Sequence, residues 1–179
     1  GFGRPGTLFA CEQAGIAPDL LCLSKSITGG YLPLSVVMAS DGVYEAFYDD
    51  ELTRGFLHSH SYTGNALACR AALATLDIFA HDGVIAANRA KTERYTALAQ
   101  PLAQHGRVRN FRNLGMIWAF EVAAADPAFA RVFHAHALRH ELLLRPIGNT
   151  VYFMPPYVIA DDEWRLLVER TLACLDCCD

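Results

Sequence analysis

Residues 20–30 read LLCLSKSITGG, in which a short apolar run is followed by Lys25, by small residues and by the pair Gly29-Gly30. Short apolar runs bounded by turn residues predict buried strands, so we expect one strand over Leu20–Leu23 and another over Leu34–Ala39. Lys25, one of two lysines in the chain, stands where the first strand ends. A lysine there is a candidate for a desolvated amine that attacks a carbonyl to form a Schiff base. The alternative is a lysine that only marks a strand end and extends to water.

Helical patterns and helix-breaking residues organise the rest of the chain. Alanine-rich sequence predicts a helix from Asn65 to Phe79, Asp82-Gly83 interrupts it, and a second long helix is expected to end near Gln104. The shorter expected elements are helices at Leu8–Ala14, Val43–Tyr48, Pro127–His140 and Asp161–Cys174, and strands at Val108–Phe111, Met116–Val122, Leu142–Arg145 and Thr150–Met154.

This order of elements predicts two domains. Residues 1–104 have an α/β pattern, whereas residues 105–179 follow the order strand, strand, helix, strand, strand, helix that is typical of a small α+β domain. The first residue is Gly1 instead of methionine, and we expect the chain to be part of a longer protein.

Composition excludes several classes of function. A net charge of −4 provides no basic face for a phosphate backbone, so we expect no nucleic-acid partner. No run approaches the roughly 18 apolar residues of a membrane span, so we expect no membrane association. The six cysteines do not form a disulfide framework, and Cys174, Cys177 and Cys178 lack the second ligand pair of a zinc site. We therefore expect no metal and a cytoplasmic location, where thiols stay reduced.

The first six residues, GFGRPG, match the dinucleotide-binding pattern G-x-G-x-x-G. That function requires a strand before the motif and a helix that opens on its last glycine. The residues given include no strand ahead of the motif, Pro5 restricts the backbone of Arg4, and no acidic residue follows a strand at the expected distance. We therefore reject the dinucleotide interpretation.

Two further segments carry groups that suit an anion. Residues 58–65, HSHSYTGN, come directly before a predicted helix, whose N-terminus could bind an anion through hydroxyl and backbone N–H groups. The alternative is an ordinary N-cap made by Thr63 or Asn65. Arg145, followed by Pro146, ends an apolar run and is placed to bind a carboxylate in a bidentate manner. The alternative there is a surface arginine at a strand end.

Taken together, these segments resemble the class III, fold-type I pyridoxal-phosphate aminotransferases over essentially the whole chain. The lysine and glycine motifs are shared by the class. Residues 58–68 resemble the members that serve biotin synthesis, and Arg145–Gly148 with Tyr152–Tyr157 resemble them most specifically. The resemblance implies an α/β fold, with residues 1–104 as the C-terminal part of the large pyridoxal-phosphate-binding domain. Residues 105–179 would be the small C-terminal α+β domain.

The resemblance also implies a role for each motif residue. Lys25 would form the Schiff base with pyridoxal phosphate and move the proton in catalysis. Ser61, with Tyr62 beside it, would bind the cofactor phosphate of the neighbouring subunit in a homodimer. Substrate contacts are implied for Arg145, Tyr152 and Gly30.

The implied reaction moves the amino group of S-adenosylmethionine to 8-amino-7-oxononanoate, which gives 7,8-diaminononanoate by ping-pong kinetics. The aspartate that pairs with the cofactor ring in this family lies before the position that matches Gly1, so we expect the chain alone to be poorly active. Two rival hypotheses stay open. One is another class III aminotransferase, acting on ornithine, 4-aminobutyrate or an ω-amino acid, and the other is a non-catalytic remnant or assembly module.

Overall fold

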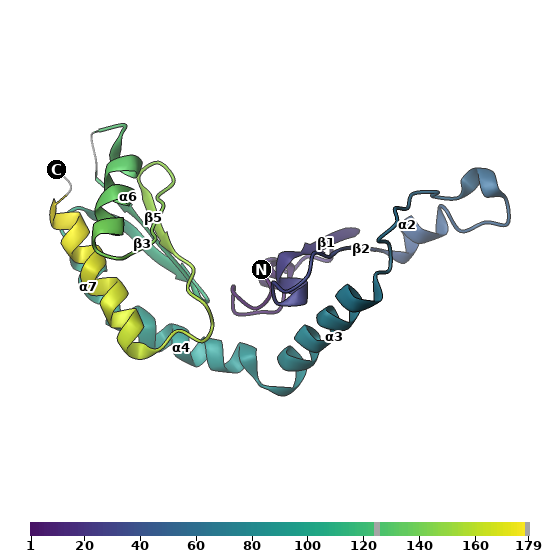
Figure 1. The fold of residues 1–179 in the computed structure, drawn as a ribbon, viewed down its shortest axis with the longest axis horizontal. Coiled ribbons are helices and arrows are strands. Elements are labelled where there is room, and N and C mark those ends of the chain that lie inside the picture. Colours follow the sequence, from purple (N-terminus) through teal and green to yellow (C-terminus); the bar gives the residue numbers. More distant parts are fainter. Residues whose placement is uncertain (124–125, 178–179) are drawn as a thin grey trace. The chain divides into compact units, whose positions relative to one another are not determined.

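The computed structural model describes residues 1–123 and 126–177, and it divides the chain into two compact units (Figure 1). Unit 1 comprises Gly1–Phe2 and Thr7–Val84, and unit 2 comprises Gly3–Gly6 and Ile85–Asp179. No helix among the described residues is long and apolar enough to cross a membrane. These units are compact regions and need not coincide with domains. The domain boundary expected between residues 104 and 105 therefore stays a prediction.

Unit 1 is built on a two-stranded antiparallel sheet. Strand β1 (Leu20–Ser24) pairs with β2 (Ser35–Ala39) along its whole length, from Leu20 opposite Ala39 to Ser24 opposite Ser35. The remaining elements are α1 (Ala10–Ala14), the 3-10 turns η1 (Lys25–Thr28) and η2 (Leu52–Arg54), α2 (Asp41–Glu45) and α3 (Ala66–His81).

The core of unit 1 is small. Phe2, Ile27 and Ala72 are buried there, and Leu23 and Val36 of the two strands pack against them. The expectation of fully buried strands is wrong, because side chains alternate across a strand and only one face of this sheet is covered by described residues. Val37, on the other face, is 64% exposed.

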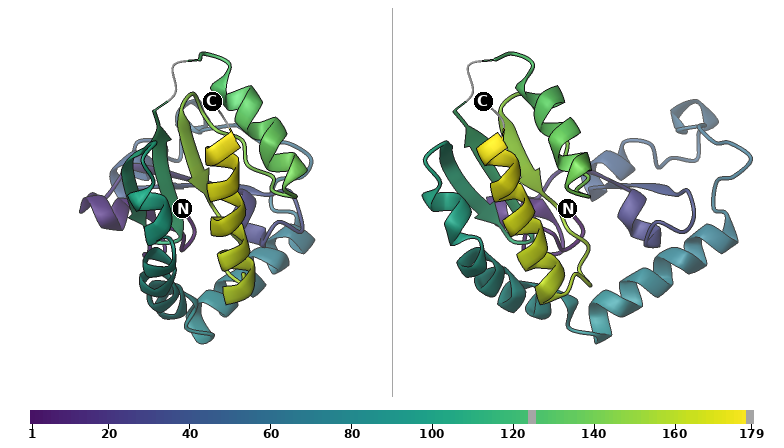
Figure 2. Two further views of the ribbon diagram at one scale, coloured as in Figure 1. Left: turned by 90° about the vertical axis from the view of Figure 1, so that its left-hand side faces the viewer. Right: turned by 60° about the vertical axis from the view of Figure 1, so that its left-hand side comes forward.

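Unit 2 is an antiparallel sheet covered by helices on one face (Figure 2). The strands are β3 (Val108–Leu114), β4 (Ile117–Val122) and β5 (Thr150–Phe153), in that spatial order. The helices are α4 (Val84–Leu98), α5 (Gln100–Gln104), α6 (Phe129–Arg139) and α7 (Asp161–Cys177).

Alternation along β4 explains why one face of this sheet is apolar and buried. Trp118, Phe120 and Val122 are fully buried, whereas the residues between them are partly exposed. Trp118 and Trp164 of α7 lie with ring centroids 4.4 Å apart, so the sheet and α7 share one aromatic core.

Two sequence expectations for unit 2 are wrong. The second long helix is two helices, α4 and α5, because Pro101 stands in the first turn of α5 and cannot donate to the preceding turn. Leu142–Arg145 is not a strand. Its backbone pairs with α6 instead, since Leu142 N–H donates to Ala137 O at 2.8 Å.

Gly115 shows why Gly3–Gly6, the larger part of the glycine motif at the start of the chain, lie in unit 2. Its φ is +55°, and a Cβ atom there would collide with the backbone of Arg4-Pro5-Gly6. The Met116 N–H donates to Arg4 O at 2.8 Å, and Arg89 Nε donates to Gly6 O at 2.7 Å. The motif is thus packed on the turn between β3 and β4.

Lys91 of α4 stabilises the loop between β5 and α7. Its Nζ donates to Tyr157 O at 2.6 Å and to Ile159 O at 3.2 Å. We expect Lys91→Met to lower the free energy of unfolding by about 1–3 kcal/mol, because two carbonyl groups lose a charged donor. Urea denaturation measures this change, and Lys91→Arg should recover part of it. An unchanged denaturation midpoint in Lys91→Met would contradict the expectation.

Tyr95 makes the stability of unit 2 sensitive to alkali. Its buried ring stacks on Trp164 at 4.9 Å, and its hydroxyl lies 2.9 Å from Ile159 O and 3.1 Å from Asp161 Oδ1. Burial, and next the hydrogen bond with Asp161, raises the pKa of Tyr95 above its ordinary value of 10.0.

A raised pKa in the folded state means that folding favours the neutral phenol. The corresponding stability is fully present below the unfolded pKa, about 10, and is lost as pH rises through the folded value. We expect the free energy of unfolding to fall more steeply above about pH 10 in the wild type than in Tyr95→Phe, as measured by urea denaturation. Parallel pH profiles of the two proteins would contradict this.

Candidate active site

Lys25 stands at the junction of β1 and η1, where the chain leaves the sheet. Its φ is +53°, in the left-handed region that non-glycine residues rarely adopt. Such a conformation costs on the order of 1–3 kcal/mol and is found mainly at functional sites, where the surrounding structure holds it. The Lys25 side chain is exposed, so the described residues do not provide the desolvation expected from the sequence.

Thr28 fixes the turn that follows Lys25. This residue is 1% exposed, and its hydroxyl donates to Leu32 O at 2.6 Å. Gly29 and Gly30 lie between Thr28 and Leu32. Their φ values are +63° and +86°, which glycine adopts without strain. The turn therefore holds the backbone after Lys25 in one conformation.

Residues 60–65 form a hydrogen-bonded turn before α3. The His60 N–H donates to Thr63 Oγ1 at 3.0 Å, and the Thr63 N–H donates to His60 O at 2.9 Å. Asn65 Oδ1 accepts from the Ala68 N–H at 3.0 Å, so Asn65 is the N-cap of α3. The N-cap expected from the sequence is confirmed at Asn65, and the anion-binding role of the same segment stays a prediction.

A cavity of about 850 Å³ joins these two segments within unit 1. Among the expected site residues, Lys25 and Tyr62 line it. Ser61 and Gly30 are not among its lining residues, although each belongs to a turn that borders it. Ser24 and Ser35 are polar lining residues that the sequence did not single out, whereas His60, Thr63 and Asn65 belong to the segment 58–65 for which it allowed anion binding.

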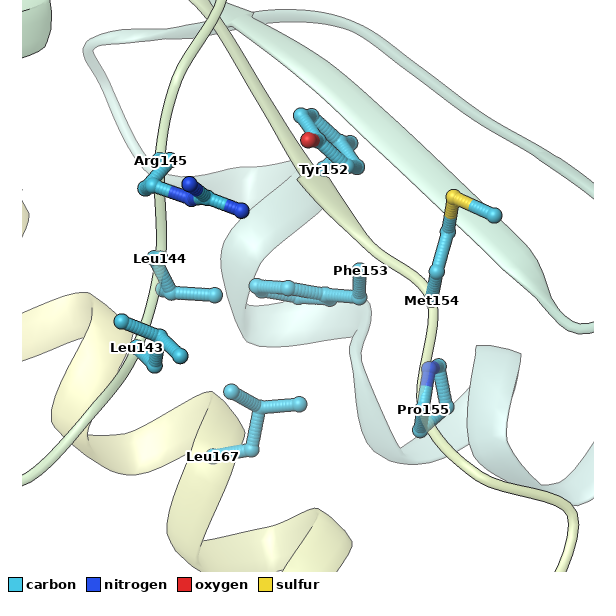
Figure 3. Close-up of a pocket in the computed structure, with 8 residues that line it drawn as sticks. All are labelled: Leu143, Leu144, Arg145, Tyr152, Phe153, Met154, Pro155 and Leu167. Atoms are coloured by element: carbon cyan, nitrogen blue, oxygen red, sulfur yellow. The ribbon is translucent and has the colours of Figure 1, made fainter. Parts of the chain in front are cut away.

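The other two expected site residues, Arg145 and Tyr152, line a smaller cavity in unit 2 (Figure 3). Its volume is about 240 Å³, and Leu144, Phe153 and Met154 form apolar walls. Figure 3 shows the Arg145 guanidinium extended toward the strand that carries Tyr152 and Phe153. The structure therefore brings Arg145 and Tyr152 together, and their contacts with a substrate stay a prediction.

The Arg145 side chain is exposed and makes no hydrogen bond or ion pair with any residue that the structure describes. A guanidinium has five N–H donors arranged for two parallel hydrogen bonds to a carboxylate. An arginine with free donors beside apolar walls is suited to a ligand with a carboxylate and an aliphatic chain.

Arg4 is a residue near this cavity that sequence analysis did not assign. Its guanidinium donates to Pro155 O at 2.8 Å and to Met154 O at 3.4 Å, and it lies over the Tyr157 ring at 5.3 Å. Arg4 therefore holds one wall of the Arg145 cavity. Local sequence contains no signal for a contact across about 150 residues.

No group of three or more His, Cys, Asp or Glu side chains suited to a metal ion is present among residues 1–123 and 126–177. The amine at Lys25 and the guanidinium at Arg145 are instead suited to covalent carbonyl chemistry and to carboxylate binding.

The family model for class III aminotransferases matches residues 1–175. The chain belongs to the class III aminotransferases. Among curated members of this class, it is 46% identical to an adenosylmethionine-8-amino-7-oxononanoate aminotransferase of Helicobacter pylori, over 98% of this chain and 42% of that protein. It is 40% identical to the enzyme with the same name in Nitratidesulfovibrio vulgaris, over 94% of this chain and 33% of that protein.

Solved aminotransferase structures share its fold. The adenosylmethionine-8-amino-7-oxononanoate aminotransferase of Methanocaldococcus jannaschii superposes with a TM-score of 0.89 at 31% identity, covering 100% of this chain and 44% of that one. An amine transaminase from an uncultivated Pseudomonas species, solved in its PLP-bound form, superposes with a TM-score of 0.86 at 30% identity. The match covers 100% of this chain and 43% of that one. This class III chain thus spans about two fifths of the length of such relatives, and its α/β fold is the matching part of a fold-type I aminotransferase.

Proposed function

We propose that this chain belongs to a pyridoxal-phosphate-dependent aminotransferase of biotin synthesis. The enzyme would transfer the amino group of S-adenosylmethionine to 8-amino-7-oxononanoate and form 7,8-diaminononanoate. The observation that carries the proposal is Lys25, held with φ +53° at a strand end and open to a cavity of about 850 Å³. The names of relatives that are 40% and 46% identical support the choice of substrates.

The residues that line the Lys25 cavity fit pyridoxal phosphate. An accessible primary amine on the cavity wall suits the cofactor's carbonyl, and the neighbouring Ser24 and Ser35 keep that part of the wall polar. When bound, pyridoxal phosphate supplies an electron sink for the bond that breaks at the substrate's amine-bearing carbon. Lys25 would hold the cofactor covalently, release it to the substrate and then move a proton to and from that carbon.

Arg145 would bind the carboxylate of 8-amino-7-oxononanoate. Its exposed donors and the apolar walls of its cavity support this role, since the substrate carries a carboxylate at the end of an aliphatic chain. Tyr152, on the same cavity, would contact that chain or its carboxylate. Gly30 is the weaker proposal, because it lies in the turn after Lys25 and does not line either cavity.

Ser61 and Tyr62 would contact the cofactor of the neighbouring subunit in a homodimer, in the cytoplasm. Tyr62 is 74% exposed, and Ser61 is also exposed, so both side chains are accessible to a second chain. We also propose that residues 1–104 belong to the large domain and residues 105–179 to the small one.

The amino donor tests this function. The holoenzyme that contains these residues is expected to form 7,8-diaminononanoate from 8-amino-7-oxononanoate with S-adenosylmethionine, and at most slowly with alanine or glutamate. Mass spectrometry of the product measures both. Activity with alanine or glutamate alone would favour another class III aminotransferase, and no transfer with any donor would favour a non-catalytic module.

A further inference from the structure

We propose that His134 is a positioning residue for Arg145. It would fix the backbone from which the guanidinium reaches the substrate carboxylate, and it would do so without touching the substrate. This inference rests on the proposed function, in which Arg145 binds that carboxylate.

The contact that carries the inference is a short hydrogen bond between α6 and the segment before Arg145. His134 Nδ1 lies 2.7 Å from Leu144 O. A carbonyl oxygen only accepts, so the hydrogen must be on Nδ1. The Leu144 carbonyl and the Arg145 N–H belong to the same planar peptide unit, so this bond fixes the orientation of the peptide that leads into Arg145.

His134 takes the place of a strand partner at this position. Residues 142–145 form neither helix nor strand and lie outside the sheet, so no ladder of backbone hydrogen bonds orients them. Among the described residues, two hydrogen bonds reach the backbone of residues 142–145. One is donated by the Leu142 N–H to Ala137 O, and the other joins His134 to Leu144 O. Leu142 and Leu144 are each 8% exposed, whereas Leu143 between them is 75% exposed. A rotation of this segment would therefore turn Arg145 out of its cavity.

Nothing else described in the structure holds the Arg145 side chain. Its guanidinium has no partner among the described residues, so its direction depends on its backbone and on packing against the cavity walls. Pro146 restricts the conformation of Arg145 but does not orient the peptide that precedes it. The bond from His134 supplies that orientation.

The test compares the free acid of 8-amino-7-oxononanoate with its methyl ester in the holoenzyme. We expect His134→Ala to raise KM for the acid by about tenfold, with little change in kcat and little change for the ester, because one hydrogen bond is lost and only carboxylate binding depends on it. His134→Asn should restore most of the loss, since Nδ2 of asparagine occupies the place of Nδ1. The control is His136→Ala on the same helix, because the His136 ring makes no hydrogen bond with described residues.

Equal losses for acid and ester in His134→Ala, or no loss at all, would overturn the inference. The inference would also be overturned if His134→Asn, with a normal melting temperature, kept the raised KM for the free acid. In the double variant with Arg145→Ala, the His134→Ala change should not raise KM for the free acid any further, because both residues act through the same carboxylate contact.

A second measurement separates this inference from the proposed reaction. If the wild-type holoenzyme does not aminate 8-amino-7-oxononanoate, the proposed function fails. The effect of His134 on carboxylate binding can then still be measured as the affinity for nonanoate, by calorimetry. Binding about tenfold weaker in His134→Ala, but not in His136→Ala, would support the positioning role. Equal binding in wild type and His134→Ala would overturn it.

Discussion

Replacement of Lys25 by alanine is expected to lower aminotransferase activity by about 10³-fold or more. Lys25 is proposed both to bond to pyridoxal phosphate and to move a proton, and alanine can do neither. Alanine has the same Cβ as lysine, so the left-handed conformation costs the variant no more than it costs the wild type, and the loss of activity should greatly exceed any loss of stability. Single-turnover kinetics and thermal denaturation of the same preparation measure the two effects.

The lysine content of the chain makes a direct test of this assignment possible. Lys25 and Lys91 are its two lysines, and the Lys91 amine already donates to Tyr157 O at 2.6 Å. Borohydride reduction after addition of pyridoxal phosphate should therefore label Lys25, as read by peptide mass spectrometry. Lys91→Arg, which keeps the charge, should be labelled like the wild type, and Lys25→Ala should not. A label retained on Lys91 in Lys25→Ala, with activity near the wild-type level, would refute the assignment.

Local signals in the sequence predicted most elements of the fold. The strands near Leu20–Leu23 and Leu34–Ala39 are confirmed because turn residues bound both of them. The final helix from Asp161 is confirmed as well, with Asp161 in its first turn instead of at its N-cap. The α/β fold and the class III family are confirmed as well. These properties depend on residues close to one another in the chain.

Properties that depend on how elements pack against one another were not predicted. The run at Leu142–Arg145 has the composition of a strand, yet α6 supplies its hydrogen bonds, and composition cannot reveal the partner. The exposure of Lys25 agrees with the alternative that the sequence left open, a lysine that extends to water, because an apolar run predicts burial without showing which layer would cover it. The left-handed conformation at Lys25 has no sequence signal, since lysine rarely adopts it.

The candidate site was predicted in part. Lys25 and Tyr62 line one cavity, and Arg145 and Tyr152 line another, whereas the roles of these four residues stay predictions. The supporting residues were not found, because Arg4 and His134 act through backbone carbonyl groups that any sequence would offer. Such support becomes visible only when the fold brings the segments together.

Replacement of Arg145 by alanine is expected to raise KM for 8-amino-7-oxononanoate by about 10²-fold, because a bidentate, charge-assisted interaction with the carboxylate is lost. Arg145→Lys should recover only part of this loss, since a single ammonium group cannot make the two parallel hydrogen bonds of a guanidinium. Steady-state kinetics with the free acid and with its methyl ester measure the effect, and the ester should be nearly unaffected.

The structural context makes this prediction separable from a loss of stability. Arg145 has no hydrogen bond or ion pair with described residues, so its removal leaves no buried partner unsatisfied, and we expect the melting temperature to stay within about 2 °C of the wild type. Arg139, exposed near the end of α6, provides the control for a general loss of positive charge. If Arg139→Ala raised KM for the acid as much as Arg145→Ala, the effect would be long-range attraction of the substrate by charge. If only Arg145→Ala raised it, the carboxylate would be bound in the cavity between Leu144 and Tyr152.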